Sequence, residues 1–108
     1  MKLDITATTR PDPLGRGGMI QVRLKAVACR DDGTPYDHPT AKDDGVPQRI
    51  FVEREAVIQS GGATDAQLAK NLAQGWEAKA RGQLAMALAA LGLEQPVAAT
   101  PKTFKVTL

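Results

Sequence analysis

The stretch that decides the fold is residues 64–91, TDAQLAKNLAQGWEAKARGQLAMALAAL. Thr64 and Gln67 have the capping-box spacing, in which each side chain satisfies a backbone donor at the start of a helix. Apolar residues then recur every four positions and give a helix one broad apolar face: Leu68, Leu72, Trp76, Ala80, Leu84 and Leu88. Gly92 stands where a left-handed residue commonly closes a helix. The sequence therefore predicts one long helix over 64–91.

Alternating apolar and polar residues predict three strands before this helix and one after it. The predicted ranges are about 2–9, 19–29, 49–59 and 104–108. One face of the clearest strand, 19–29, carries charge. This favours a mostly antiparallel sheet with one solvent-exposed face. The order β-β-β-α-β predicts an α+β fold of two layers, in which the long helix covers a sheet of about four strands. We expect one domain over 1–108.

Two places in these elements are irregular. The alternation fails at residues 56–58, where both faces of the strand become apolar, and a β-bulge would explain that failure. Gly75 and Gly82 lie seven residues apart within the helix. They predict either the close approach of another backbone or a kink.

Residues 30–48 form a long connection between the second and third strands. It contains two Asp-Asp-Gly turn signals, at 31–33 and 43–45, and three prolines. Connections of this length are uncommon in compact domains and tend to be functional or mobile. We therefore expect a long flexible or extended loop that projects as an arm.

Composition excludes several classes of protein. The net charge of +2 comes from scattered, interleaved charges, which gives no strong indication of nucleic acid or membrane as a partner. Cys29 is the only cysteine, so no internal disulfide can form. The N-terminal residues lack a signal-peptide pattern, and no apolar run is long enough to cross a membrane. These features predict a cytoplasmic protein, or a virion protein if the chain is phage-encoded.

The acids of the long connection could form a site for a hard cation, since oxygen ligands suit calcium and magnesium: Asp31, Asp32, Asp37, Asp43 and Asp44, together with His38. Their spacing does not match an EF-hand, and turn formation explains them more simply. Cys29, His38 and Asp37 contain the residue types of a nucleophile, a base and an orienting acid. No signature surrounds the cysteine, and a small buried thiol is the simpler interpretation. We therefore predict no catalytic, metal or cofactor-binding residue, and no cofactor.

Two glycine-rich segments resemble anion-binding loops only in composition. Residues 15–18 precede a strand, so no helix N-terminus can direct backbone donors at a phosphate there. Residues 60–62 precede the helix, but they lack the lysine and the spacing of a P-loop. Both segments are interpreted as turns or linkers.

Basic residues of the strands offer an alternative function. Arg23, Lys25, Arg54 and Lys105 are a possible basic face of the sheet, to which Arg49 and Lys102 could add. Such a face would bind nucleic acid, and binding would weaken steeply with salt. The aromatic residues that usually stack bases are scarce, and Phe51 and Phe104 are expected in the core. A nucleic-acid-binding accessory domain is therefore the alternative to the preferred hypothesis.

The second half of the predicted helix indicates a protein partner. Residues 84–91 carry no charge, whereas a surface helix normally has a polar outer face. We predict a subunit or partner interface formed by Leu84, Met86, Leu88, Leu91 and Leu93. The preferred hypothesis is a non-enzymatic structural or assembly protein, a small subunit of a homo-oligomer or of a larger complex. In layout, though in no motif, the chain resembles small phage-encoded virion and assembly proteins.

Overall fold

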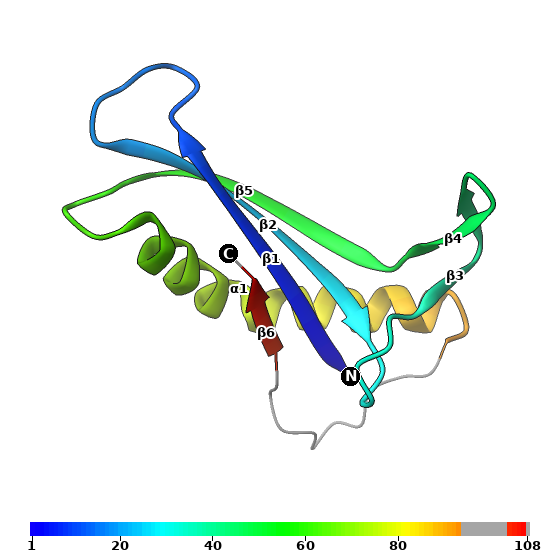
Figure 1. Ribbon diagram of the computed structural model, residues 1–108. Coiled ribbons are helices and arrows are strands. Elements are labelled where there is room, and N and C mark those ends of the chain that lie inside the picture. The colour runs from blue at the N-terminus through cyan, green and yellow to red at the C-terminus, as the bar shows by residue number, and fades with distance from the viewer. Residues whose placement is uncertain (94–103, 108) are drawn as a thin grey trace.

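The computed structural model describes residues 1–93 and 104–107, which form a flat body with a hairpin projecting from one end (Figure 1). The body contains one helix and four strands: α1 (Asp65–Ala90), β1 (Lys2–Pro11), β2 (Met19–Cys29), β5 (Phe51–Gln59) and β6 (Phe104–Thr107). The hairpin contains β3 (Asp37–Asp43) and β4 (Val46–Arg49), and we call it the arm. The chain therefore has the predicted α+β fold, with one helix packed on a mostly antiparallel sheet.

The strands of the body lie in the order β5-β2-β1-β6. β2 pairs antiparallel with β1 and with β5, whereas β6 pairs parallel with β1 and so returns beside the first strand. The register between β2 and β5 is unbroken from Met19 opposite Gln59 to Val27 opposite Phe51. The predicted bulge at 56–58 is therefore wrong, and the irregular polarity there reflects partial burial of Val57 on the face away from the helix.

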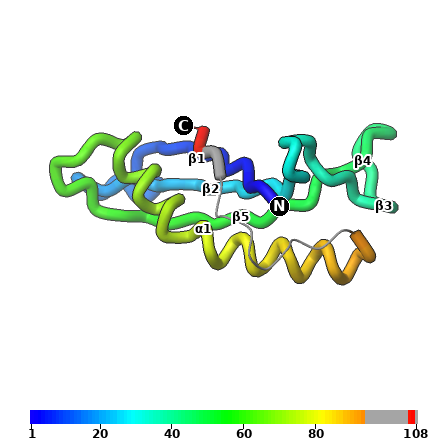
Figure 2. Tube along the Cα trace, turned by 90° about the horizontal axis from the view of Figure 1, so that it is seen from below, coloured from blue at the N-terminus to red at the C-terminus, as the bar shows by residue number. Residues whose placement is uncertain are grey.

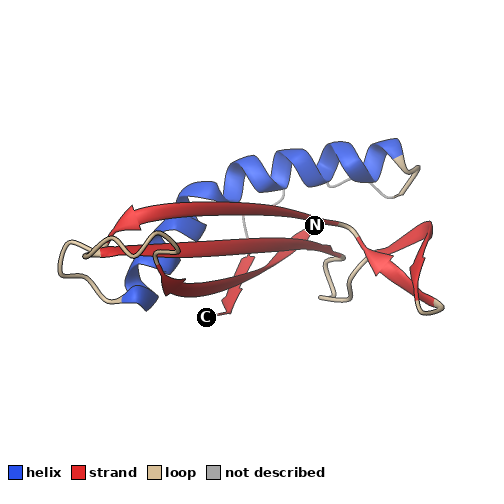
Figure 3. Ribbon diagram, turned by 90° about the horizontal axis from the view of Figure 1, so that it is seen from above, coloured by secondary structure: helices blue, strands red, loops and turns tan. Residues whose placement is uncertain are grey.

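The core lies between the sheet and α1, which crosses one face of the sheet obliquely (Figure 3). Alternate residues of β1 and β2 point into it, because successive side chains of a strand face opposite sides. The fully buried residues include Leu3, Ile5, Val22 and Leu24 of the sheet and Ala69, Ala73, Leu84 and Leu88 of the helix. Each buried Leu, Ile or Val stabilises the fold by about 1.5–3 kcal/mol. The small alanines let the helix lie close to the sheet where the two cross.

The predicted signals at the ends of α1 are largely present. The Gln67 N–H donates to Thr64 Oγ1 at 3.1 Å, but the Gln67 side chain donates to Asn71, so only half of the capping box forms. Gly92 adopts the left-handed φ of 71° at the other end. The helix is one continuous element. A Cβ added at either of its two glycines would meet nothing within 4 Å, so the predicted close approach of a backbone is absent over the described residues.

The arm occupies part of the connection predicted as a flexible or extended loop. Its strands meet at a two-residue turn, where Asp44 and Gly45 have φ of 49° and 79°. Positive φ at both positions is typical of the tight hairpin turns whose twist matches that of paired strands. The register shifts between the base of the arm, where Asp37 pairs with Arg49, and its tip. The connection is therefore an extended arm, with a regular tip and an irregular base.

Candidate interaction surface

The residues weighed as a catalytic group have separate structural roles. The Cys29 thiol is buried and lies 3.7 Å from the Val27 carbonyl oxygen, and burial raises its pKa. His38 Nδ1 accepts the N–H groups of Thr40 and Ala41 at 3.1 and 2.8 Å. Asp37 forms an ion pair with Arg49. A raised thiol pKa disfavours the thiolate that nucleophilic chemistry needs.

The acids weighed as cation ligands are likewise used in turns and ion pairs. Asp31 lies 2.9 Å from the N-terminal ammonium group, which lowers its pKa. Asp32 accepts both the N–H and the hydroxyl of Thr34, and these hydrogen bonds lower its pKa. Asp43 and Asp44 lie at the tip of the arm. Within residues 1–93 and 104–107, no three histidine, cysteine or acidic side chains gather as a metal site would require.

The glycine-rich loop between β1 and β2 is organised by Asp12. This carboxylate is buried and accepts the N–H groups of Leu14 and Arg16 at 3.1 and 3.3 Å. It also bonds the Arg16 side chain at 2.5 Å, which holds the pKa of Asp12 below its usual range. The Leu14 and Arg16 donors of this loop are therefore already bonded to a protein carboxylate.

The possible basic face is not assembled as predicted. Arg23 and Lys25 lie on the open face of the sheet, but the register places them opposite Glu55 and Glu53. Arg23 Nε lies 2.8 Å from Glu55 Oε2.

The remaining basic residues do not extend that face. Arg54 is opposite Leu24 in the register and so belongs to the face that α1 covers. Lys105 is aligned with Asp4 across β1 and β6, and its side chain lies outside the described part of the chain, as does all of Lys102. The open face is therefore a mixed row of acids and bases rather than a basic surface.

The five residues predicted as an interface on the helix divide between core and surface. Leu84 and Leu88 are 0% exposed and belong to the core of this chain, so they cannot meet a partner. Leu91 and Leu93 are half-buried against that core. Met86 is 75% exposed and is the one member that faces outward. Leu84 and Leu88 are buried because they continue the stripe of Trp76 and Ala80 at steps of four residues and so face the sheet with it.

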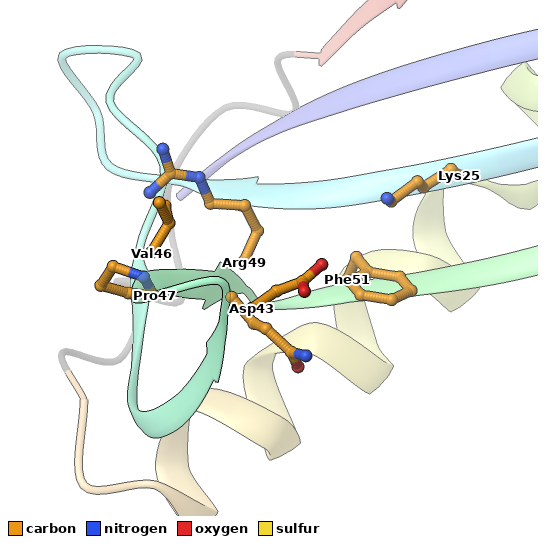
Figure 4. Close-up of a pocket in the computed structure, with 7 residues that line it drawn as sticks. Lys25, Asp43, Val46, Pro47, Arg49 and Phe51 are labelled. Atoms are coloured by element: carbon orange, nitrogen blue, oxygen red, sulfur yellow. The ribbon is translucent and has the colours of Figure 1, made fainter.

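A groove separates the arm from the open face of the sheet (Figure 4). Its volume is about 440 Å³, and it is lined by Lys25, Asp43, Val46, Pro47, Gln48, Arg49 and Phe51. The ammonium group of Lys25 lies 4.3 Å from the centre of the Phe51 ring. Phe51 is 40% exposed and Val46 is 59% exposed. The groove thus combines exposed apolar surface with charges of both signs.

A second groove, of about 420 Å³, lies between the base of the arm and the end of α1. It is lined by His38, Gln48, Arg49, Ile50, Phe51, Ala87, Ala90 and Leu91. Phe51 borders both grooves, so the expectation that it is a core residue is wrong. The sequence signal that could have revealed this is the run Ile50-Phe51-Val52, in which apolar residues on both faces begin a strand beside a long connection.

No family model, no curated protein and no solved structure matches this chain. Across the described residues, α1 contains too few apolar residues to cross a lipid bilayer. The surface formed by the arm and its two grooves is the candidate site.

Proposed function

We propose that this chain is a non-enzymatic assembly protein, a subunit that self-associates through the arm and the neighbouring end of α1. The observation that carries the proposal is the arm itself. It projects from the body, and neither of its strands contains a buried residue (Figure 1). Isolated two-stranded hairpins are marginally stable in water, so a hairpin of this kind gains most from packing on a partner.

Exposed apolar residues near the arm support the same proposal. Val46 on the arm and Phe51 at its base are two of the four large exposed apolar residues of the described chain, and both line the groove beside the open face. Of the other two, Leu14 lies in the loop at the opposite end of the sheet (Figure 1) and Met86 lies on α1. Surfaces that gather such residues beside polar ones commonly mark protein interfaces. A subunit of this kind fits the small virion and assembly proteins that the layout resembles.

The test is the mass of the protein in solution, measured by light scattering on a sizing column. The wild type is expected to be an oligomer, and Val46→Lys is expected to reduce its mass while the circular dichroism spectrum is unchanged. Leu14→Lys is the matched control, because it adds the same charge at an exposed apolar position far from the arm. A wild type that is monomeric over the whole accessible concentration range would contradict self-association.

A further inference from the structure

The outer edge of β5 differs from the other strand edges of the molecule. Natural edge strands are protected against pairing by shortness, proline, lysine or bulges. β3 and β4 each contain a proline, β6 has four residues, and the part of β1 that extends past β6 ends in a proline. β5 has nine residues, no proline, no lysine and no shift in its register with β2. It lies at one side of the sheet, with β2 between it and β1, and so presents a long and regular edge (Figure 2).

Two hydrogen bonds at the ends of β5 show which of its backbone groups point outward. The Ala28 N–H donates to the Ile50 carbonyl oxygen at 2.9 Å, and the Ser60 N–H donates to the Gly18 carbonyl oxygen at 2.7 Å. Even-numbered residues therefore direct their N–H and C=O toward β2, and alternation directs those of the odd-numbered residues outward. The outward set is Phe51, Glu53, Glu55, Val57 and Gln59. No other described strand pairs with this set.

The charges on β5 restrict how two copies of this edge can pair. An antiparallel pairing must place outward-directed residues opposite each other, so its register can shift only in steps of two residues. The register that pairs all nine residues places Glu55 against Glu55, and the one that pairs residues 51–57 places Arg54 against Arg54. Like charges directly opposite each other are destabilising. Pairing of residues 53–59 opposes no like charges, and it is the longest register with this property.

The outer pairs of this register are compatible. Glu53 lies opposite the partner's Gln59, whose amide can donate a hydrogen bond to the carboxylate. Arg54 lies opposite the partner's Ile58, so its aliphatic stem can cover an apolar residue while its guanidinium stays in water. A groove of about 420 Å³ lies at this part of the strand and is lined by Arg23, Glu53, Arg54 and Glu55. The partner's residues 57–59, which lie opposite 53–55, carry no charge that would repel these side chains.

The central pairs are also compatible. Glu55 needs no base from a partner, because Arg23 Nε already lies 2.8 Å from its carboxylate, and it lies opposite the partner's Val57. Ala56 lies opposite the partner's Ala56, and these small side chains let the two strands approach. The same segment therefore fits a second copy of itself, as an interface with two-fold symmetry requires.

The arm and the end of α1 lie outside the paired segment. The grooves beside both of them include Phe51, two residues before the segment begins. Continued alignment of the two chains places the partner's Gly61 opposite Phe51, within the small residues Ser60-Gly61-Gly62. A second copy can therefore pair with β5 without bringing a large side chain against the arm.

From this self-complementarity we infer that β5 pairs antiparallel with β5 of a second copy of this chain, through residues 53–59 of both. The two sheets then form one continuous sheet about a two-fold axis beside Ala56. Backbone hydrogen bonds supply affinity when a strand is added to an edge, and the side chains select the register. The inference rests on the proposed function as an assembly protein and adds a second self-contact to that of the arm. A subunit with two separate self-contacts can link into assemblies larger than a dimer.

The register is tested by disulfide cross-linking of Ala56→Cys in the full chain under mild oxidation. Opposed residues that do not exchange hydrogen bonds have Cα atoms about 4.5 Å apart, which a disulfide can span. We therefore expect a covalent dimer on a non-reducing gel. The wild type gives the background, because its one cysteine is buried.

Arg54→Cys is the matched control for the cross-link. Residue 54 lies on the same face of β5 as residue 56, but in this register its two copies are offset by roughly 13 Å along the strands, which a disulfide cannot span. We expect no covalent dimer from this variant. A dimer from Arg54→Cys alone would show the register of residues 51–57, and equal dimer from both variants would show random collision. Either result would overturn the inference.

The charge at position 59 provides the second measurement. Gln59 is exposed and lies opposite the partner's Glu53 in the proposed register. Gln59→Glu opposes two acids at two symmetric places, so it is expected to weaken self-association roughly 2- to 30-fold. Gln59→Lys opposes a base to the same acid and is expected to strengthen it. Dissociation constants are measured by sedimentation on chains that also carry Val46→Lys, which removes the contact of the arm. Shifts in the same direction for both variants would contradict the register.

Failure of this inference is distinguishable from failure of the proposed function. Absence of a covalent dimer from Ala56→Cys would overturn strand pairing even if Val46→Lys dissociates an oligomer. A covalent dimer in a protein whose mass Val46→Lys does not change would instead retain strand pairing and remove self-assembly through the arm.

Discussion

The body and the arm are both built from antiparallel strands, but they are held together differently. In the body, β1, β2 and β5 pair in unbroken registers, and one face of the sheet is buried under α1. In the arm, the register is shifted, each strand contains a proline, and no residue is buried. The body therefore has a hydrophobic core of its own, whereas the arm depends on backbone pairs and surface contacts.

This difference implies two levels of stability in one chain. Segments with few buried contacts open locally at a lower free energy than the core, and amide exchange detects such opening. The arm should therefore exchange its amides by local opening, while β1 and β2 exchange only when the whole body unfolds. The proposed function uses this difference, because a partner that packs on the arm supplies the burial that the arm lacks.

The largest expected effect is that of Leu84→Ala. This side chain is 0% exposed, so its truncation should lower the free energy of unfolding by about 2–5 kcal/mol. Amides of β1 and β2 should then exchange roughly 30-fold to several thousand-fold faster, while amides of the arm keep their rates. Met86→Ala, two positions away and exposed, is the control and should change stability by less than about 0.5 kcal/mol. Equal acceleration in the arm would show that body and arm unfold together.

A smaller effect within the body is expected at the start of α1. Thr64→Ala removes the oxygen that accepts the Gln67 N–H, and loss of such a cap costs about 0.5–2 kcal/mol. The urea midpoint should fall while the slope of the transition stays the same, because the same surface is exposed on unfolding. Thr64→Ser keeps the oxygen and should behave nearly as the wild type. A similar loss in both variants would assign the effect to the methyl group rather than to the cap.

The fold could be predicted because its signals are local. Alternation fixes which residues of β1 and β2 face the core, and Thr64 and Gly92 mark the ends of the helix. The exposure of Phe51 could not be predicted in the same way, because it depends on which strand lies at an edge and on where the arm projects. The run Ile50-Phe51-Val52 indicates that both faces of the strand are apolar there, but which of them is exposed is a property of the topology.

The candidate site could be predicted only in part, because the position of the arm also depends on the topology. The uncharged run at the end of the helix contains one large exposed apolar residue, Met86. The burial of Leu84 and Leu88 follows from the same four-residue stripe as Trp76 and Ala80, so their assignment to an interface was avoidable. The error for Arg54 was avoidable, since it shares the parity of Val52, which faces the helix.

The stability of the protein is expected to depend on pH through Asp12, which lies in the loop between β1 and β2. Hydrogen bonds from Arg16 lower the pKa of Asp12 from its ordinary value of 3.8, as other partners do for Asp31 and Asp32. A carboxylate with a lowered folded-state pKa contributes its full stability above about pH 4, and the contribution is lost as the pH falls through the folded-state pKa. The melting temperature should therefore decrease below about pH 4.

Asp12→Asn separates the contribution of this one residue. At neutral pH the variant should be less stable than the wild type, and the two curves should converge as acid protonates Asp12. The difference should be smaller than that for Thr64→Ala, because the side chain of Arg16 is 53% exposed and solvent screens the pair. Parallel curves down to the lowest pH would show that acid acts through other carboxylates.

The smallest effect is expected at the base of the arm. Asp37 and Arg49 form an ion pair in which both side chains are about half exposed, and such pairs contribute roughly 0.2–1 kcal/mol. Arg49→Ala should therefore leave the melting temperature nearly unchanged and accelerate exchange only at arm amides, by no more than about fivefold. Added salt should weaken the wild-type pair in the same way and reduce the difference between the two proteins. A large fall in the melting temperature would instead mean that the arm is part of the cooperative unit of the body, and the distinction between the two regions would then be wrong.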